Sequence, residues 1–292
     1  MNIEKKIISN LNKCYSLAEL SYQGKHCFLA AAEKKDPCYL FAEDGTQLET
    51  VWERPGGVMT MAQVPGSDGQ FLATHKFYSP NDSMDAEIVI ATPQGNGNWE
   101  IRTLCSAPFV HRFGILNRGG ADYLIVCCLK TGHEHKDDWR FEGACYGAQL
   151  PGDLSSFDKA HPLKLTLLKG AMLKNHGYCT IRHGGHDAAL VACEQGTFLF
   201  DPPAVPGADW EITRILDIPS SDSILMDFDG DGKLELGCIS PFHGASLTIW
   251  HLDEHGRYVP QWKYERPESE TEMIHATCAC TLLGKPAWVA GW

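Results

Sequence analysis

The chain has no apolar stretch that approaches the roughly 20 residues needed to span a membrane. Its first residues, MNIEKKIISNLNKC, include lysines but lack the apolar core of a signal peptide. Positive charge is also scarce, because 25 Lys and Arg stand against 37 Asp and Glu, for a formal net charge of -12. These absences argue against nucleic acid or an anionic membrane as partner, and they predict a cytoplasmic protein.

Several catalytic and cofactor motifs are missing as well. The chain has no GxSxG, no Walker loop and no Rossmann fingerprint. No CxxC pair stands beside a second one, which argues against a zinc ribbon. Of the 12 cysteines, several, such as Cys127, Cys128 and Cys193, lie inside apolar runs, where a free thiol behaves as a small hydrophobe. We therefore expect reduced cysteines.

What the sequence does contain is a repeat of short strand patterns. Strongly apolar strands are expected at 25–32, 70–75, 122–129, 187–194, 234–240 and 286–292. A later strand, often with Trp, is expected at 48–52, 98–104, 163–168, 209–216 and 260–265. The apolar strands begin 45 to 65 residues apart, a period typical of four-stranded propeller blades. The repeat predicts an all-β chain that forms a single β-propeller domain over 1–292, with six four-stranded blades. Seven or five blades, or an array of β-sandwiches, are the alternatives.

The two ends of the repeat predict how the ring closes. Residues 3–11 resemble a fourth strand without a blade of its own, and the last blade, expected from 271, lacks a third strand. An N-terminal strand added to the last blade would remove an open sheet edge. We therefore expect the N-terminal strand to close the ring.

An acidic turn lies ahead of the fifth apolar strand. Asp227, Asp229 and Asp231 alternate, glycines allow a tight turn, and Glu235 follows. Calcium requires several oxygen ligands on a loop that can wrap it. The turn is therefore interpreted as a structural calcium site, with a plain Asp/Gly hairpin without an ion as the alternative.

The histidines converge if the propeller interpretation is correct. In each propeller blade, the innermost (first) strand starts at one face and the second strand returns to that face. Residues at the start of first strands and at the end of second strands therefore meet around one mouth of the central channel. First-strand starts supply His111, His176 and His275, and second-strand ends supply His75, Lys130, His133, His135, Glu194 and His243. Three histidines with open positions are typical of a catalytic metal. We expect a divalent transition metal (Zn, Mn or Fe) on His111, His176 and His275, with His243 as fourth ligand. The alternative is a chance gathering of core and loop residues.

The remaining mouth residues predict the catalytic and binding groups. His75, His135 or Lys130 is expected to act as base near neutral pH, and Glu194 as base or further ligand. Cations suit a carboxylate or polyhydroxyl ligand, and an aromatic plane suits a sugar ring. The expected substrate-binding residues are Arg112, His133, Trp139, Arg140 and Tyr178. For 133–140 a solvated polar loop is the alternative. No role is expected for His26, His161, His183, His186, His251 and His255.

The C-terminal part resembles a known family. Residues 226–252 and 275–292 carry the acidic turn, the segment Pro241-Phe242-His243-Gly244, His275 and a final Gly-Trp strand. In this they are similar to FG-GAP (VCBS-like) propellers related to the propeller domain of aldos-2-ulose dehydratase. The resemblance implies metal-dependent elimination of water from a keto sugar. The cupin domains of that enzyme are absent, and most acidic turns of the family are missing here.

These observations together predict a metal-dependent carbon–oxygen lyase or dehydratase. It would act on a small keto sugar or uronate by proton abstraction next to a carbonyl or carboxylate. Return of the proton would make it a sugar epimerase or isomerase instead. The rival class is a non-enzymatic propeller that binds a glycan or a protein. Hydrolysis by a carboxylate pair has little support, because Glu194 has no obvious acidic partner.

Overall fold

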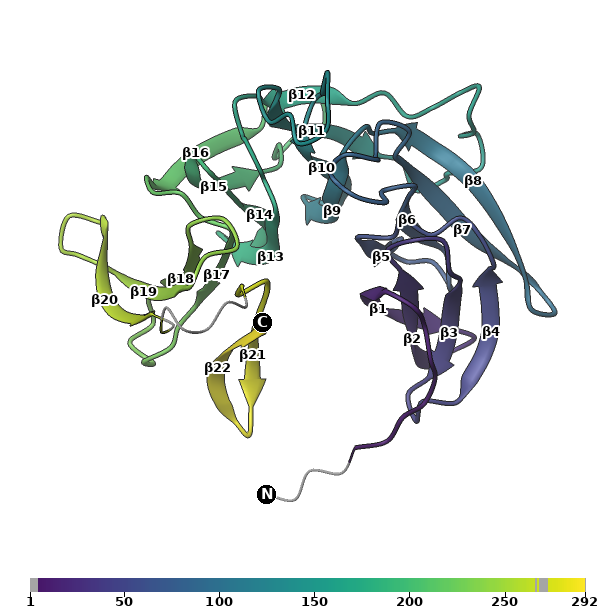
Figure 1. Ribbon diagram of the computed structural model, residues 1–292, viewed down its shortest axis with the longest axis horizontal. Helices are drawn as coiled ribbons and strands as arrows, with labels where there is room; N and C mark the ends of the chain where they lie inside the picture. Colours follow the sequence, from purple (N-terminus) through teal and green to yellow (C-terminus); the bar gives the residue numbers. More distant parts are fainter. Residues whose placement is uncertain (1–4, 266, 268–272, 292) are drawn as a thin grey trace. The chain divides into compact units, whose positions relative to one another are not determined.

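The computed structural model describes residues 5–265, 267 and 273–291. All regular secondary-structure elements in these residues are β-strands. Each sheet is built from strands that are consecutive in the chain and lie side by side (Figure 1). The described residues form five four-stranded sheets and one two-stranded sheet. The described residues contain no helix long and apolar enough to cross a membrane.

The sheets follow the chain in order. The first contains β1 (Cys14–Tyr22), β2 (Lys25–Ala32), β3 (Cys38–Ala42) and β4 (Gln47–Trp52). The second contains β5 (Met61–Gln63), β6 (Phe71–His75), β7 (Glu87–Gly95) and β8 (Asn98–Ser106). The third contains β9 (Val110–Arg118), β10 (Ala121–Lys130), β11 (Glu142–Leu150) and β12 (Thr166–Lys169).

The remaining sheets make up the C-terminal half. The fourth contains β13 (Gly177–His183), β14 (His186–Cys193), β15 (Gly196–Asp201) and β16 (Glu211–Leu216). The fifth contains β17 (Asp222–Met226), β18 (Glu235–Ser240), β19 (Ser246–Leu252) and β20 (Tyr258–Glu265). The two-stranded sheet contains β21 (Ala276–Leu282) and β22 (Lys285–Gly291).

Burial follows strand position within a sheet. All five residues of β6 are buried, as are six of the eight in β14, which explains why these second strands are continuous apolar runs. By contrast, β20 is exposed at seven of its eight positions, as expected of an outer strand. The predicted second strands form as β2, β6, β10, β14, β18 and β22, and the predicted fourth strands as β4, β8, β12, β16 and β20.

The chain divides into two compact units. The first unit comprises residues up to Ile115 together with Gly132–Asp138 and Leu150–Thr166, and the second comprises Leu116–Thr131, Trp139–Gln149 and Leu167 onward. Each unit buries its own apolar side chains. The first has a core around Leu29, Trp52 and Phe71. The second has cores that include Val191, Phe200 and Leu236.

The expectation that residues 3–11 form a strand is wrong for residues 5–11, which have no strand structure. This segment instead contacts the turn between β3 and β4. A Cβ atom added to Gly45 would lie 2.5 Å from Ile8 Cγ2, and Lys6 Nζ donates to the Asp44 carbonyl at 3.4 Å. The apolar side chain of Ile8 thus lies against the first sheet. Residues 3 and 4 lie outside the described residues.

The last sheet has two strands, β21 and β22, in the described residues, and it has no third strand there, as expected. It begins at Ala276, later than the expected start at 271, which itself lies outside the described residues. Residues 273–275 precede the strand, and His275 N donates to the Gly291 carbonyl at 2.9 Å. His275 therefore lies directly before β21, at the start of a first strand, as the sequence predicts.

Candidate metal centre

His176 is placed by the segment that leads into β13. Lys174 adopts a φ of 53°, and His176 N donates to the Lys174 carbonyl at 2.7 Å, so the chain folds back before the strand begins. Gly177 follows at a point where a Cβ would come within 2.6 Å of the Ser221 carbonyl oxygen. The close approach requires glycine there. It helps to bury the neighbouring His176, which is 2% exposed.

His243 lies in a tight turn after β18. Gly244 N donates to the Pro241 carbonyl at 2.8 Å, and His243 itself has a φ of 49°. Non-glycine residues rarely take such a φ, and they tend to do so at functional sites. A Cβ on Gly244 would lie 2.2 Å from the Ser240 carbonyl oxygen, so the turn needs glycine at that position.

The same turn holds the third histidine in place. Ile274, which is fully buried, donates its N–H to the Gly244 carbonyl at 3.4 Å. The chain that carries His275 is thereby attached to the turn that carries His243. Three separate segments of the second unit thus bring one histidine each to a common place.

We call His176, His243 and His275 the histidine triad. Ring centroids are separated by 4.8 Å for His176 and His243, 5.1 Å for His176 and His275, and 4.8 Å for His243 and His275. One ring nitrogen from each histidine lies within 4.8 Å of the others, so the triad could hold a metal ion. Sequence reasoning named all three residues, and the structure brings them together.

Electrostatics in the triad favour a neutral ring at His243. Burial, and then the nearby His176, His275 and Lys174, lower the pKa of His243 to about 3. A neutral imidazole keeps the lone pair that a metal requires. The Nε2 atom of His243 is buried and has no hydrogen-bond partner within the described part of the chain. His176 Nδ1 stands 3.7 Å from Asp222 Oδ2, a carboxylate placed to orient the ring. The donor set therefore fits a borderline transition metal.

Aromatic and charged side chains border the triad. Phe242 stacks on the His243 ring with centroids 4.0 Å apart. Lys174 Nζ lies 5.0 Å from the Phe242 ring centroid and 2.8 Å from Glu194 Oε1. The ion pair therefore brings a cation and a carboxylate to the edge of the triad.

Lys130 and Trp139, two further predicted residues, belong to the same neighbourhood. Lys130 is fully buried, and its Nζ lies 4.9 Å from the centroid of the Trp139 ring. The Nζ of Lys174 lies 5.8 Å from the same ring. Two of the predicted catalytic residues, Glu194 and Lys130, belong to the second unit, as the triad does.

The remaining predicted residues of the second unit have other surroundings. The hydroxyl of Tyr178 is 2.9 Å from Thr180 Oγ1, and burial raises its pKa. Its ring packs against the core that contains Phe198. The guanidinium carbon of Arg140 lies 5.8 Å from the Phe141 ring centroid. Neither contact connects these residues to the triad.

His111, the other predicted metal ligand, belongs to the first unit. Its Nε2 is 3.2 Å from the Tyr15 hydroxyl, and its ring meets Phe77 edge-on at 5.3 Å. Arg112 donates to the Met59 carbonyl at 2.7 Å, and its guanidinium carbon lies 5.6 Å from the Tyr15 ring centroid. The role of both residues stays a prediction.

The predicted bases His75 and His135 also lie in the first unit. His75 is 2% exposed and packs edge-on against Trp52 at 4.6 Å. Burial, with a smaller contribution from Lys76, lowers its pKa to about 3. His135 Nδ1 lies 3.7 Å from Asp138 Oδ2 on an exposed loop.

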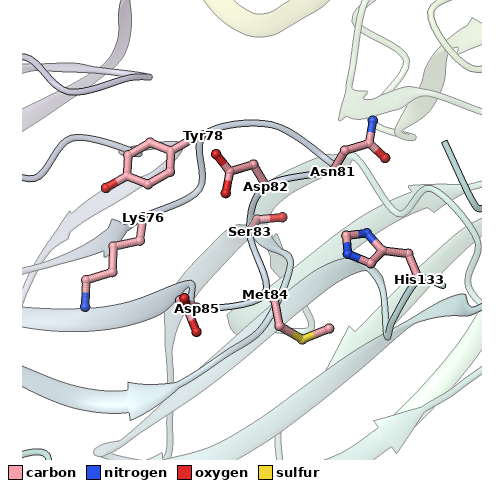
Figure 2. A pocket seen from close by; sticks show the side chains of 8 residues that line it. All are labelled: Lys76, Tyr78, Asn81, Asp82, Ser83, Met84, Asp85 and His133. Atoms are coloured by element: carbon pink, nitrogen blue, oxygen red, sulfur yellow. The ribbon is translucent and has the colours of Figure 1, made fainter. Parts of the chain in front are cut away.

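A polar pocket of about 370 Å³ in the first unit includes His133 (Figure 2). Figure 2 shows His133 on one side of Ser83 and the Lys76 and Tyr78 side chains on the other. Ser83 Oγ and His133 Nδ1 are buried and lack hydrogen-bond partners among the described residues. A ligand with hydroxyl groups could satisfy both atoms.

The acidic turn lies between β17 and β18, at the opposite end of these strands from His243. Asp227 accepts from Gly230 N at 2.6 Å and from Gly232 N at 3.0 Å, so it shapes the loop. Asp229, Asp231 and Glu235 instead surround His251, whose Nε2 is 3.2, 3.8 and 3.4 Å from their carboxylate oxygens. This four-residue acidic cluster could also hold a metal.

Sequence reasoning missed His251, although the sheet register contains the signal. Leu236 on β18 pairs with Trp250 on β19, so the residues next to this pair, Glu235 and His251, become neighbours. It also missed His183 and His186, which meet Asp201 in a third group able to hold a metal. In both cases the histidines lie at strand ends, away from the expected channel mouth.

Comparisons with known proteins identify the fold. No family model matches the chain, and no curated protein matches it in sequence. A variant of the Synechocystis apocarotenoid oxygenase is 12% identical with a TM-score of 0.51, over 95% of this chain and 65% of that one. The Cps50 (Swd1) β-propeller domain of Myceliophteria thermophila is 14% identical with a TM-score of 0.51, over 90% of this chain and 76% of that one.

The Dos1 propeller is similar as well, at 12% identity and a TM-score of 0.50, over 91% of this chain and 62% of that one. The chain thus spans less than two thirds of the length of the oxygenase and of the Dos1 propeller. At such identities the likeness concerns the fold alone. The chain is all-β with propeller-like structure, as its repeat predicts.

Proposed function

We propose that the protein is a metal-dependent enzyme whose centre is the histidine triad. The observation that carries the proposal is the convergence of three rings from three segments, with the pKa of His243 lowered to about 3. His243 Nε2 is buried without a hydrogen-bond partner among the described residues, and because such an atom is costly, its burial needs a reason. A bound divalent transition metal, Zn²⁺, Mn²⁺ or Fe²⁺, would supply that reason.

The reaction that fits best is proton abstraction next to a carbonyl or carboxylate of a small keto sugar or uronate. A metal bound at the triad would polarise the substrate oxygen and stabilise the negative charge that develops. Lys174, next to Phe242, would attract an anionic substrate. Glu194, held by Lys174 at 2.8 Å, would accept the proton at its carboxylate. The buried Lys130 would keep Trp139 in place as a platform for the sugar ring.

Loss of a hydroxyl group after proton abstraction makes the protein a lyase or dehydratase, and return of the proton makes it an epimerase or isomerase. The resemblance to FG-GAP propellers related to aldos-2-ulose dehydratase supports elimination. Six sheets in the described residues support six blades, with the sixth represented by β21 and β22. An oxygenase among the similar structures agrees with catalysis on this fold without indicating its class.

A second candidate function is a non-enzymatic propeller that binds a glycan. The polar pocket in the first unit supports it, because its buried Ser83 and His133 atoms lack hydrogen-bond partners among the described residues. Such a module would need no metal at the triad. Metal dependence therefore separates the two functions.

The test combines metal analysis with a substrate screen. The purified protein, the double variant His176→Ala/His275→Ala and the control His255→Ala, a change at an exposed residue, are compared for bound transition metal. Keto sugars and uronates are then screened for the absorbance of an enone. The proposal expects product formation in the wild type and the control but not in the double variant, which should also bind one equivalent of metal less than the wild type. A wild type that binds sugar equally well without any metal would favour the glycan-binding module.

A further inference from the structure

The hairpin between β13 and β14 carries a pair of histidines in the second unit. Gly184 and Gly185 form its turn with φ values of 55° and 87°, which glycine adopts without strain. His183 and His186 flank the turn and are directly paired across the two strands. Paired residues in adjacent antiparallel strands project their side chains to the same face of the sheet.

A carboxylate from the next strand completes the group. Ala189 pairs with Phe200, so Asp201 at the end of β15 lies opposite Ala188. Side chains two residues apart share a face, and Asp201 therefore joins His186 on its face of the sheet. We call His183, His186 and Asp201 the hairpin cluster. It contains residues from three consecutive strands.

The distances within the hairpin cluster are short. His183 Nδ1 is 2.9 Å and His186 Nε2 is 2.6 Å from the same oxygen, Oδ1 of Asp201. The Asp201 side chain is 5% exposed, whereas those of His186 and His183 are 14% and 50% exposed. The carboxylate is thus buried, and the two imidazoles lie between it and solvent.

We propose that the hairpin cluster is a second metal site, specific for a borderline divalent transition metal such as Zn²⁺ or Co²⁺. Two imidazoles and one carboxylate are the donors that such ions prefer. With metal–ligand bonds of about 2.0–2.1 Å, donors this far apart subtend angles of roughly 80–90°, which leaves further positions for water. The exposure of His183 provides an entry path for the ion.

The site is separate from the histidine triad. His176 immediately precedes β13, whereas His183 ends it, so the strand holds the two sites about 20 Å apart at 3.3 Å per residue. A metal in the hairpin cluster would tie β13, β14 and β15 together. Its role is structural, and it requires no catalytic activity of the protein.

Co²⁺ titration of the metal-free protein, followed by visible absorption, tests the proposal. The titration uses the His176→Ala background, in which the triad has lost a ligand. Two variants are added to this background in turn: His183→Gln, at a ring that is 50% exposed, and His186→Ala. The matched control is His161→Ala, because His161 forms a similar contact with Asp158, 3.1 Å from Nδ1 to Oδ1, but has no second histidine in that contact.

In both hairpin variants, the affinity for one equivalent of Co²⁺ should fall on the order of 100-fold, so that this equivalent is no longer tightly bound. The control should lose no Co²⁺ affinity. Thermal melting should show a metal-dependent rise in Tm for the background and none for His183→Gln. Equal Co²⁺ binding in the background and in His183→Gln would overturn the proposal. Because the background already lacks an intact triad, this outcome does not depend on the proposed catalytic function.

Discussion

The histidine triad and the acidic cluster place the same side chain in opposite electrostatic surroundings. In the triad, burial and neighbouring imidazoles lower the pKa of His243 to about 3. In the acidic cluster, a hydrogen bond to the Leu252 carbonyl and the carboxylates of Asp229 and Glu235 raise the pKa of His251. His243 therefore presents a free lone pair at neutral pH, whereas the acidic cluster favours a protonated ring at His251.

This difference shows that a residue type does not define a metal site by itself. A proton on His251 competes directly with any cation on Asp229 and Asp231, because Nε2 lies 3.2 and 3.8 Å from their oxygens. No such competition is expected at His243 above about pH 3. Four experiments would test the contrast, beginning with the largest expected effect.

Removal of a triad ligand should have the largest effect. His243→Ala leaves two imidazoles, and we expect the affinity for Zn²⁺ to fall on the order of 100-fold or more. Competition with a chromophoric chelator measures this change. His255→Ala, at an exposed residue, serves as control. An unchanged affinity in His243→Ala would show that the triad is not the metal centre.

Cation binding at the acidic cluster should depend on pH. A raised histidine pKa means that the stabilisation by protonated His251 is fully present below about pH 6.5 and is lost as the pH rises through the raised value. Calcium affinity should therefore increase on the order of tenfold from pH 6 to pH 8.5. Calorimetric titration of the wild type and His251→Gln tests this dependence. A pH dependence that persists in the variant would contradict the competition.

The metal-free triad should have the opposite pH dependence in stability. Since the folded-state pKa of His243 is depressed, the unfolded chain binds more protons below pH 6.5, and folding weakens as the pH falls from there toward 3. After allowance for solvent screening of this partly exposed ring, we expect about 1 kcal/mol less stability at pH 5 than at pH 8 from His243. Urea unfolding of the wild type and His243→Gln at both pH values measures the difference, which the variant should lack.

The smallest effect should come from the stacked ring beside the triad. Phe242→Ala removes the contact with His243, and such aromatic pairs contribute about 0.5–1.5 kcal/mol. We expect a few-fold loss of Zn²⁺ affinity, measured with the same chelator. Phe242→Tyr keeps the ring and should retain the affinity. A loss as large as that of His243→Ala would mean that the ring does more than orient its neighbour.

Much of the fold follows directly from the sequence pattern. The apolar runs at 25–32 and 187–194 became β2 and β14 within one residue, because a strand buried on both faces must be apolar throughout. The prediction of a strand in the N-terminal segment was wrong. Its strand-like pattern of apolar residues instead reflects a contact between Ile8 and the turn at Gly45. A short segment can pack one side chain against a turn without entering a sheet.

The candidate site was predicted in part. The rule about strand starts and ends selected His176, His243 and His275 because it follows from the order of strands alone. It could not select His251 or His186, whose partners come from neighbouring strands through the sheet register. Nor could it indicate the pocket around Ser83, which depends on how the loop at 76–85 folds against His133.

The sequence by itself determined the repeat, the all-β class and the ends of strands where histidines gather. These features are local, since they depend on periodicity and on turns between adjacent elements. Only the tertiary structure decided which histidines are buried together and which meet carboxylates. That outcome depends on distances between segments far apart in the chain, and on the burial that lowers the pKa of His243 while neighbouring acids raise that of His251.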